Sequence, residues 1–213
     1  MKETNLNTYP VIGMSPGNSY FQDETVVFLL KKVVNQFGKT GVLIPDVPAI
    51  ATYRALGYSE NRARRDKAIP KGNALRNKVS RAMQELGYDD SQVKVFDWTR
   101  DIESEELYAE KLRRVEDLYE NNNLFQQAIR LATKEVLLTS DQEASELEVA
   151  IDIAVHYILS EFACLEFLPK YLGVPKINYI YHKRWPVFEK YIAGDFDQIS
   201  KPYLGFLLIK KES

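Results

Sequence analysis

Short apolar runs alternate with segments of helical periodicity along the chain, and this alternation restricts the fold more than any other feature. The strand-like runs lie at 9–14, 41–45, 93–96, 177–181 and 204–209. Helical spacing of apolar residues covers 23–37, a stretch from about 47, roughly 103–120, 122–138, and a segment from a capping-box match at 140–143 to about 168. Apolar strands that alternate with helices indicate parallel pairing. The sequence therefore predicts an α/β fold with a doubly wound, mostly parallel, Rossmann-like sheet.

Length and composition fit one soluble domain. The 213 residues suffice for a substantial core, and no internal repeat or flexible linker divides them, so we expect a single domain over 1–213. No apolar run approaches the roughly 20 residues of a membrane helix, and the first ten residues lack the apolar core of a signal peptide. One cysteine, Cys164, and two histidines leave little for a metal site. We expect a cytoplasmic protein without a metal and without a membrane partner.

One segment is strongly basic although the whole chain has a net charge of −2. Residues 62–81 contain eight basic residues and a single acidic one, Asp66. A solvated helix face would explain such a run, but an excess of one sign also fits contact with RNA phosphates. Pro70 and Gly72 predict a break or kink inside this segment. The candidate RNA-binding residues are Arg64, Arg65, Lys67, Lys71, Arg76, Lys78 and Arg81.

The stretch from Gly13 to Gly17, GMSPG, matches the G-x-S-x-G turn that presents a hydrolase serine. Such a serine needs a histidine base and an acid that orients it. His156 lies inside a helical segment among apolar neighbours, which favours a structural or surface role. His182 is better placed but has no obvious aspartate partner. A small serine esterase that uses Ser15 and His182 therefore remains one hypothesis.

Other polar residues converge on the same edge of the predicted sheet. Ser15 follows the first strand, and Tyr181 and His182 end the fourth. Because ligands bind at the carboxyl ends of strands in open α/β sheets, these residues belong at one rim. Tyr157 and Glu161 are four residues apart, so they share a helix face, and the apolar neighbours of that face predict that it points inward. A buried carboxylate there needs a cationic or hydrogen-bonding partner.

Three motifs, in this order, resemble those of the cyclodipeptide synthases. They are the GMSPGNSYF block, Tyr157-x-x-x-Glu161 and Tyr181-His182, and the resemblance extends from about Pro10 to Leu208. The combination of Asn18, Tyr181 and His182 is similar to the subfamily that carries Asn, Tyr and His at these positions. The resemblance implies a fold like the catalytic domain of tyrosyl- and tryptophanyl-tRNA synthetases. It also implies an enzyme that joins two aminoacyl groups from aminoacyl-tRNAs into a cyclic dipeptide, a 2,5-diketopiperazine.

The resemblance assigns catalytic roles to four residues. Ser15 would attack the first aminoacyl ester and carry first an aminoacyl and then a dipeptidyl group. Tyr157 and Glu161 would hold the α-ammonium group of the substrate. Tyr181 would relay protons during ring closure. No side chain stands out as the base for Ser15, so we expect the departing ribose oxygen or its vicinal hydroxyl to take the proton.

Substrate-binding residues are expected around Ser15. Val11 and Gly13 share one face of the first strand, Tyr179 shares a face with Tyr181, and Leu43 lies on the neighbouring strand. Such a wall favours an apolar first amino acid, with Leu, Phe, Met and Tyr all open, although core packing explains Val11 and Leu43 equally well. The other substrate-binding residues implied by the resemblance are Asn18 and His182.

The expected partners follow from the chemistry of the substrate. An aminoacyl ester on tRNA is already activated, so the enzyme would need neither ATP nor another cofactor, and the chain has no P-loop and no G-x-G-x-x-G motif. The basic segment 62–81 would contact the tRNA phosphates, with no role for DNA. Besides the esterase, a non-catalytic tRNA-binding protein with a synthetase-like fold remains an alternative.

Overall fold

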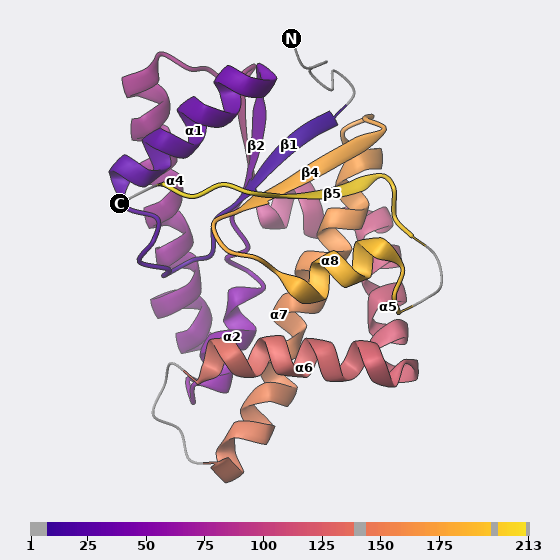
Figure 1. Cartoon of the computed structure of the whole chain (residues 1–213). Coiled ribbons are helices and arrows are strands. Elements are labelled where there is room, and N and C mark those ends of the chain that lie inside the picture. The colour runs from indigo at the N-terminus through magenta and orange to yellow at the C-terminus, as the bar shows by residue number, and fades with distance from the viewer. Residues whose placement is uncertain (1–7, 139–143, 197–199, 212–213) are drawn as a thin grey trace.

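A five-stranded parallel sheet forms the centre of the computed structural model, which describes residues 8–138, 144–196 and 200–211 (Figure 1). The strands are β1 (Thr8–Gly13), β2 (Thr40–Leu43), β3 (Val93–Phe96), β4 (Lys176–Tyr181) and β5 (Leu204–Leu208). Their spatial order is β3-β2-β1-β4-β5, and every neighbouring pair is parallel. This is the strand order of a Rossmann-type sheet, so the predicted fold class is confirmed.

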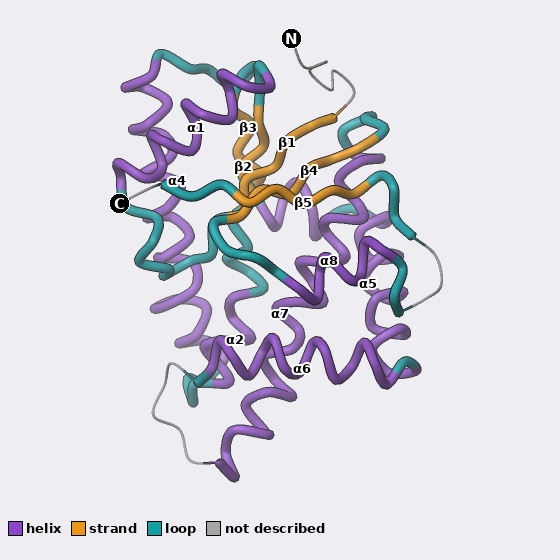
Figure 2. Tube along the Cα trace, in the orientation of Figure 1, coloured by secondary structure: helices purple, strands orange, loops and turns teal. Residues whose placement is uncertain are grey.

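Helices cover both faces of the sheet (Figure 2). The first face packs against α1 (Asp23–Phe37) and α4 (Ile69–Leu86). The second packs against α7 (Ala144–Tyr171) and α8 (Pro186–Ala193), and α2 (Ala49–Ala55), α5 (Glu106–Asn121) and α6 (Asn123–Leu137) pack in turn against α7. Shorter segments are α3 (Glu60–Arg62) and two π-helical stretches, η1 (Ala63–Ala68) and η2 (Trp98–Glu103).

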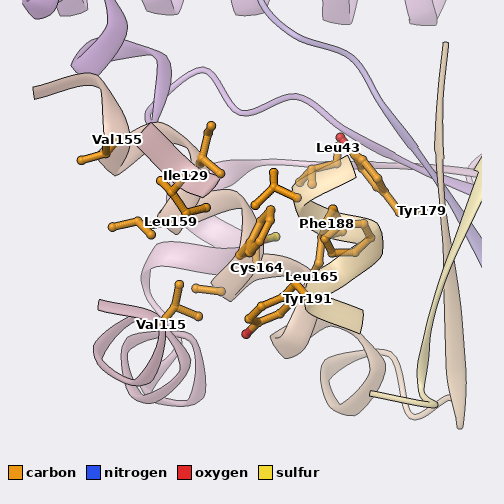
Figure 3. Close-up of a cluster of buried hydrophobic side chains, with 14 of the residues drawn as sticks. Leu43, Val115, Ile129, Val155, Leu159, Cys164, Leu165, Tyr179, Phe188 and Tyr191 are labelled. Atoms are coloured by element: carbon orange, nitrogen blue, oxygen red, sulfur yellow. The ribbon is translucent and has the colours of Figure 1, made fainter. Parts of the chain in front are cut away.

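Alternation along the strands supplies a core on each side. In β1, Ile12 belongs to the cluster under α1 and α4, whereas its neighbour Val11 belongs to the cluster under α7. The same alternation separates Val42 from Leu43 in β2. Figure 3 shows part of the second cluster, where Leu43 and Tyr179 lie among buried residues of α7 and α8. Both faces of the sheet are thus covered, as expected for parallel strands.

Of the predicted break or kink at Pro70 and Gly72, the break is wrong. The chain is helical from Glu60 through η1 into α4, and Pro70 occupies the first turn of α4. The N–H that Pro70 lacks is missing at the junction between the two kinds of helix, directly after the π-helical hydrogen bond from the Ile69 N–H to the Arg64 carbonyl, so the helix continues without a break. Gly72 instead allows close packing, since a Cβ at this position would lie 2.5 Å from the Asp46 Cβ.

Several other expectations have a clear outcome. Helix α1 has the predicted bounds, and α7 continues past the expected end near 168 to Tyr171, with Pro169 in its last turn. The capping-box match at 140–143 lies outside the described residues. The short α8 and both π-helical stretches were not predicted. In the described ranges, no helix has the length and apolar character needed to cross a membrane.

Candidate active site

The polar residues gather where the winding of the sheet changes direction. Strands β1 and β4 are neighbours, but the helix that follows β1 covers one face and the helix that follows β4 covers the other. Such a switch point leaves a crevice at the carboxyl ends of the two strands. Ser15 lies two residues beyond β1 and Tyr181 is the last residue of β4. The sheet therefore brings both side chains to the same place.

The Ser15 hydroxyl lies between two phenols. Its Oγ is 2.9 Å from the Tyr181 hydroxyl, and the Tyr157 hydroxyl donates to it at 3.3 Å. Burial raises the pKa of Tyr157 well above its usual value and also raises the pKa of Tyr181. Both phenols thus keep their protons near neutral pH and can donate hydrogen bonds to oxygen atoms. Neither is a ready base for the serine.

A tight turn holds Ser15 at the rim. The Met14 N–H donates to the Leu43 carbonyl at 2.9 Å, and the Asn18 N–H donates to the Ser15 carbonyl at 3.2 Å. Gly17 adopts φ +81°, a left-handed conformation that strains other residues. The Asn18 side chain accepts from the Tyr20 N–H at 3.0 Å and lies near the Tyr181 phenol. Asn18 thus connects the turn to the tyrosine beside the serine.

Glu161 is a buried carboxylate without a cation. Its residue is 4% exposed, and the Tyr179 hydroxyl donates to its Oε1 at 2.5 Å. Burial raises the pKa of Glu161 to about 7, although the Tyr179 hydrogen bond opposes the shift. In the part of the chain that the structure describes, no lysine or arginine forms an ion pair with it. An ammonium group brought by a ligand would supply the missing charge.

Tyr179 occupies the space that a side chain at position 13 would need. A Cβ placed on Gly13 would lie 1.9 Å from the Tyr179 hydroxyl oxygen. The Tyr179 ring stacks beside Tyr181, with centroids 6.2 Å apart and planes 12° from parallel. Val11 and Leu43 have no exposed surface and pack into the core beneath these rings. Sequence reasoning placed Tyr179 on the correct face but missed its role as the donor to Glu161.

The two histidines lie outside the hydrogen bonds of Ser15. His182 stacks on Tyr20 with centroids 4.1 Å apart and meets the edge of Phe21. Burial, with Lys183 and Lys210 nearby, lowers the pKa of His182 to about 4. Among the described residues, no hydrogen bond joins His182 to Ser15, and its buried Nδ1 has no partner. His156 is exposed on α7.

Three of the predicted RNA-binding residues connect α4 to the rest of the protein. Arg76 forms an ion pair of 2.6 Å with Asp46, whose side chain is 4% exposed. Lys78 donates to the Phe21 carbonyl at 2.7 Å. Arg81 pairs with Asp23 at the start of α1 in solvent. These three contacts fix the basic helix beside the Ser15 turn, so the side chains also have a structural role.

The remaining basic side chains face solvent or aromatic rings. Arg64 is exposed, and Arg65 pairs with Asp66 on the surface. Lys67 and Lys71 lie over tyrosine rings. The described residues include no group of three or more His, Cys, Asp or Glu side chains that could hold a metal.

Comparison with known proteins assigns the chain to a family. The family model described as cyclodipeptide synthase matches residues 7–211. The chain is 30% identical over 190 residues to cyclo(L-tyrosyl-L-tyrosyl) synthase of Mycobacterium tuberculosis, which covers 87% of this chain and 64% of that protein. It is 24% identical over 206 residues to cyclo(L-leucyl-L-leucyl) synthase of Bacillus subtilis, which covers 94% of this chain and 82% of that protein. The chain thus spans less than two thirds of the mycobacterial relative.

Solved structures share the fold. A Mycobacterium tuberculosis protein, described as showing that cyclodipeptide synthetases are related to type I tRNA synthetases, superposes with a TM-score of 0.79 at 24% identity, covering 98% of this chain and 88% of that one. A cyclodipeptide synthase of Candidatus Glomeribacter gigasporarum bound to Phe-tRNAPhe superposes with a TM-score of 0.63 at 18% identity, covering 96% and 88%. The predicted likeness to synthetase catalytic domains is confirmed for the fold. Because the family model covers nearly all of it, the chain belongs to the cyclodipeptide synthase family.

Proposed function

We propose that this protein is a tRNA-dependent aminoacyltransferase that makes a cyclic dipeptide from two aminoacyl-tRNAs through esters on Ser15. The observation that carries the proposal is the uncompensated carboxylate of Glu161, four residues along α7 from the tyrosine that touches Ser15. An α-ammonium group supplies the opposite charge. A nucleophile beside an ammonium-binding carboxylate suits a substrate with an ester and an amine on adjacent carbons.

In the first step, Ser15 Oγ bonds to the carbonyl carbon of the aminoacyl ester, and the bond from that carbon to the ribose oxygen breaks. The serine proton passes to the departing ribose oxygen, directly or through the vicinal hydroxyl. Glu161 and Tyr157 hold the ammonium group: the carboxylate pairs with it, and the phenol oxygen accepts one of its N–H hydrogen bonds. The direct partners of Ser15 in the structure are phenols, which supports a proton acceptor on the substrate.

In the second step, the neutral amine of another aminoacyl-tRNA attacks the Ser15 ester. The amide bond forms as the bond to Ser15 Oγ breaks, and the amine proton passes to that oxygen, which gives a dipeptidyl-tRNA. Ser15 Oγ then attacks the ribose ester of this dipeptidyl-tRNA, and the tRNA leaves with the serine proton on its ribose oxygen, so that the dipeptide is held on the serine. The free amine of that dipeptide then attacks its own ester carbonyl, which closes the ring and returns the proton to Ser15 Oγ. Tyr181 is well placed to relay this proton because it lies 2.9 Å from the serine. Asn18 lies near the Tyr181 phenol and is proposed to orient it, and the His182 ring stacks on Tyr20.

The proposed substrates rest on the chemistry of the site and on the similarity of the chain to known cyclodipeptide synthases. The relatives are named for tyrosyl and leucyl products, and one structural neighbour is bound to a charged tRNA. This supports an apolar first amino acid. The activated ester makes ATP and other cofactors unnecessary, and we place the reaction in the cytoplasm, where charged tRNA is made.

The test is to express the protein in a bacterial host and to search the medium for diketopiperazines by mass spectrometry. Purified protein mixed with charged tRNA should also gain the mass of an aminoacyl group. Both signals should vanish in Ser15→Ala. If the wild type gives neither signal but hydrolyses simple activated esters, it is an esterase. If it only binds tRNA, and Ser15→Ala binds equally well, it is not catalytic.

The proposed proton acceptor has its own test. A charged tRNA that ends in 2′-deoxyadenosine lacks the vicinal hydroxyl, so acylation of Ser15 should slow by at least about tenfold if that hydroxyl assists the transfer. The rate of ester formation is measured by quenched-flow or rapid acid quench with labelled amino acid. An unchanged rate would show that the vicinal hydroxyl takes no part.

A further inference from the structure

Two tyrosines form an aromatic corner at the end of α2. The rings of Tyr53 and Tyr58 meet edge to face, with centroids 6.4 Å apart and planes at 78°. Gly57 creates this corner because its φ of +85° ends the helix and turns the chain back. The Gly57 N–H then donates to the Arg54 carbonyl at 2.9 Å, and the Tyr58 N–H donates to the Tyr53 carbonyl at 3.2 Å.

Basic side chains from α3, η1 and α4 surround the two rings. The Lys71 Nζ lies 4.9 Å from the centre of the Tyr53 ring, and the Lys67 Nζ lies 4.7 Å from the centre of the Tyr58 ring. The Arg62 guanidinium is 5.6 Å from the same Tyr58 ring. Both rings remain partly exposed. We call these five residues the tyrosine platform.

The tyrosine platform borders the turn that carries Ser15. A Cβ built on Gly17 would lie 3.0 Å from the Tyr53 hydroxyl and 3.1 Å from the Lys71 Nζ. The tyrosine platform therefore contacts the Ser15 turn at Gly17, two residues beyond the proposed nucleophile. Arg76 and Lys78 fix this geometry, because they hold α4 against Asp46 and against the Phe21 carbonyl. A ligand that is bound at Ser15 and extends toward α4 would meet Tyr53 and Lys71 first.

We propose that the tyrosine platform binds the unpaired 3′ end of the aminoacyl-tRNA, with bases stacked on Tyr53 and Tyr58 and phosphates paired with the surrounding cations. This inference rests on the proposed function and adds a site for one part of its substrate. The reacting ester is attached to the terminal ribose, so the last base must lie beside the Ser15 turn when the ester reaches the serine. Exposed aromatic rings among cations are the usual site for single-stranded RNA.

The contacts that the two rings make within the protein are compatible with this use. A cation over a partly exposed ring is held weakly, whereas a base stacked on the same ring is held more strongly. A base can thus displace Lys71 or Lys67 from its ring. The displaced ammonium remains close enough to pair with a neighbouring phosphate, so the exchange leaves no charge without a partner.

The experiment uses the full-length protein and uncharged tRNA with 2-aminopurine as its terminal base, a probe whose fluorescence falls when the base stacks. Binding to the wild type should quench the probe. Tyr58→Leu should remove much of the quench and weaken binding by about 5- to 150-fold, whereas Tyr58→Phe, which keeps the ring, should behave like the wild type. Lys71→Gln should lower the slope of log affinity against log salt by about 0.7.

Lys39→Gln is the matched control. Lys39 also lies over a tyrosine ring, 5.4 Å from the centre of Tyr9, but at the start of β2, the opposite edge of the sheet. Its removal should leave the quench unchanged. Circular dichroism and thermal unfolding establish that each variant is folded, and Lys71→Gln alters only an exposed side chain.

The platform is refuted if folded Tyr58→Leu quenches and binds the probe as the wild type does, or if Lys39→Gln and Lys71→Gln have equal salt slopes. Cyclic dipeptide formation is measured in parallel. A wild type that makes product, together with an unaffected Tyr58→Leu, overturns the platform and leaves the proposed function in place. A wild type that forms neither product nor an ester on Ser15 overturns the proposed function, while the quench still decides whether the rings bind RNA.

Discussion

Replacing Glu161 with glutamine should make the free protein more stable at alkaline pH while removing its activity. The pKa of Glu161 is raised from 4.5 to about 7 because the carboxyl group is buried. Ionisation of Glu161 therefore costs more in the folded state than in the unfolded state. The resulting loss of folding stability grows as the pH rises above the pKa of the unfolded state and levels off above the pKa of the folded state. With about 1.4 kcal/mol for each pKa unit, the full penalty is about 3 kcal/mol.

The amide in Glu161→Gln has the same shape and can still accept the Tyr179 hydrogen bond, but it never ionises. Its other effects on stability do not vary with pH. The stability gained over the wild type should therefore be about 2.5 kcal/mol larger at pH 8.5 than at pH 5. For a chain of this size, the difference in melting temperature between the variant and the wild type should therefore be about 5–10 °C larger at pH 8.5 than at pH 5.

Urea unfolding of both proteins at the two pH values, followed by circular dichroism, measures this difference directly. Groups that titrate in both proteins cancel, and the tyrosines near Glu161 have pKa values raised further above their usual range. A stability difference that is the same at both pH values would refute the reasoning, because it would mean that Glu161 ionises in the folded state as easily as in water. A substitution that stabilises the fold and abolishes activity is expected where a binding residue is kept at a cost in stability.

Two further predictions concern neighbouring contacts. Tyr179→Phe removes the donor that lowers the pKa of Glu161, so this pKa should rise further and the pH profile of kcat/KM for aminoacyl-tRNA should move to higher pH on its acid side. Arg76→Met leaves the Asp46 carboxylate buried and unpaired, so urea unfolding should show a loss of about 3 kcal/mol, whereas Arg81→Gln, at an exposed ion pair, should cost less than about 1 kcal/mol. Equal losses in these two variants would contradict the structural role given to Arg76.

The parts of the site that depend on local spacing were predictable from the sequence. The four-residue interval between Tyr157 and Glu161 placed both on one helix face, and the structure buries Glu161. The rule that sites form at the carboxyl ends of parallel strands brought Ser15 and Tyr181 together, and their hydroxyls are 2.9 Å apart. The first inference needs only the spacing of residues in one helix, and the second needs only the parallel direction of the strands.

Contacts between distant elements could not be predicted in this way. The pairing of Arg76 with Asp46 and the bond from Tyr179 to Glu161 depend on how α4 and α7 pack against the sheet, which no periodicity encodes. The π-helical stretches have no apolar repeat that marks them. The prediction of a break at Pro70 failed because the proline lies where the helix changes from π to α hydrogen bonding, and the sequence does not mark that junction.

The interlocking of Gly13 with Tyr179 limits how this protein could be given new substrates. Trimming Tyr179 to admit a larger amino acid would also remove the hydroxyl that donates to Glu161. Substituting Gly13 to reshape the same space would not work either, because a side chain at position 13 would collide with the Tyr179 ring. Under the proposed function, substrate selectivity and binding of the amine would both depend on the Tyr179 side chain, so a redesigned pocket would need another hydrogen-bond donor for Glu161.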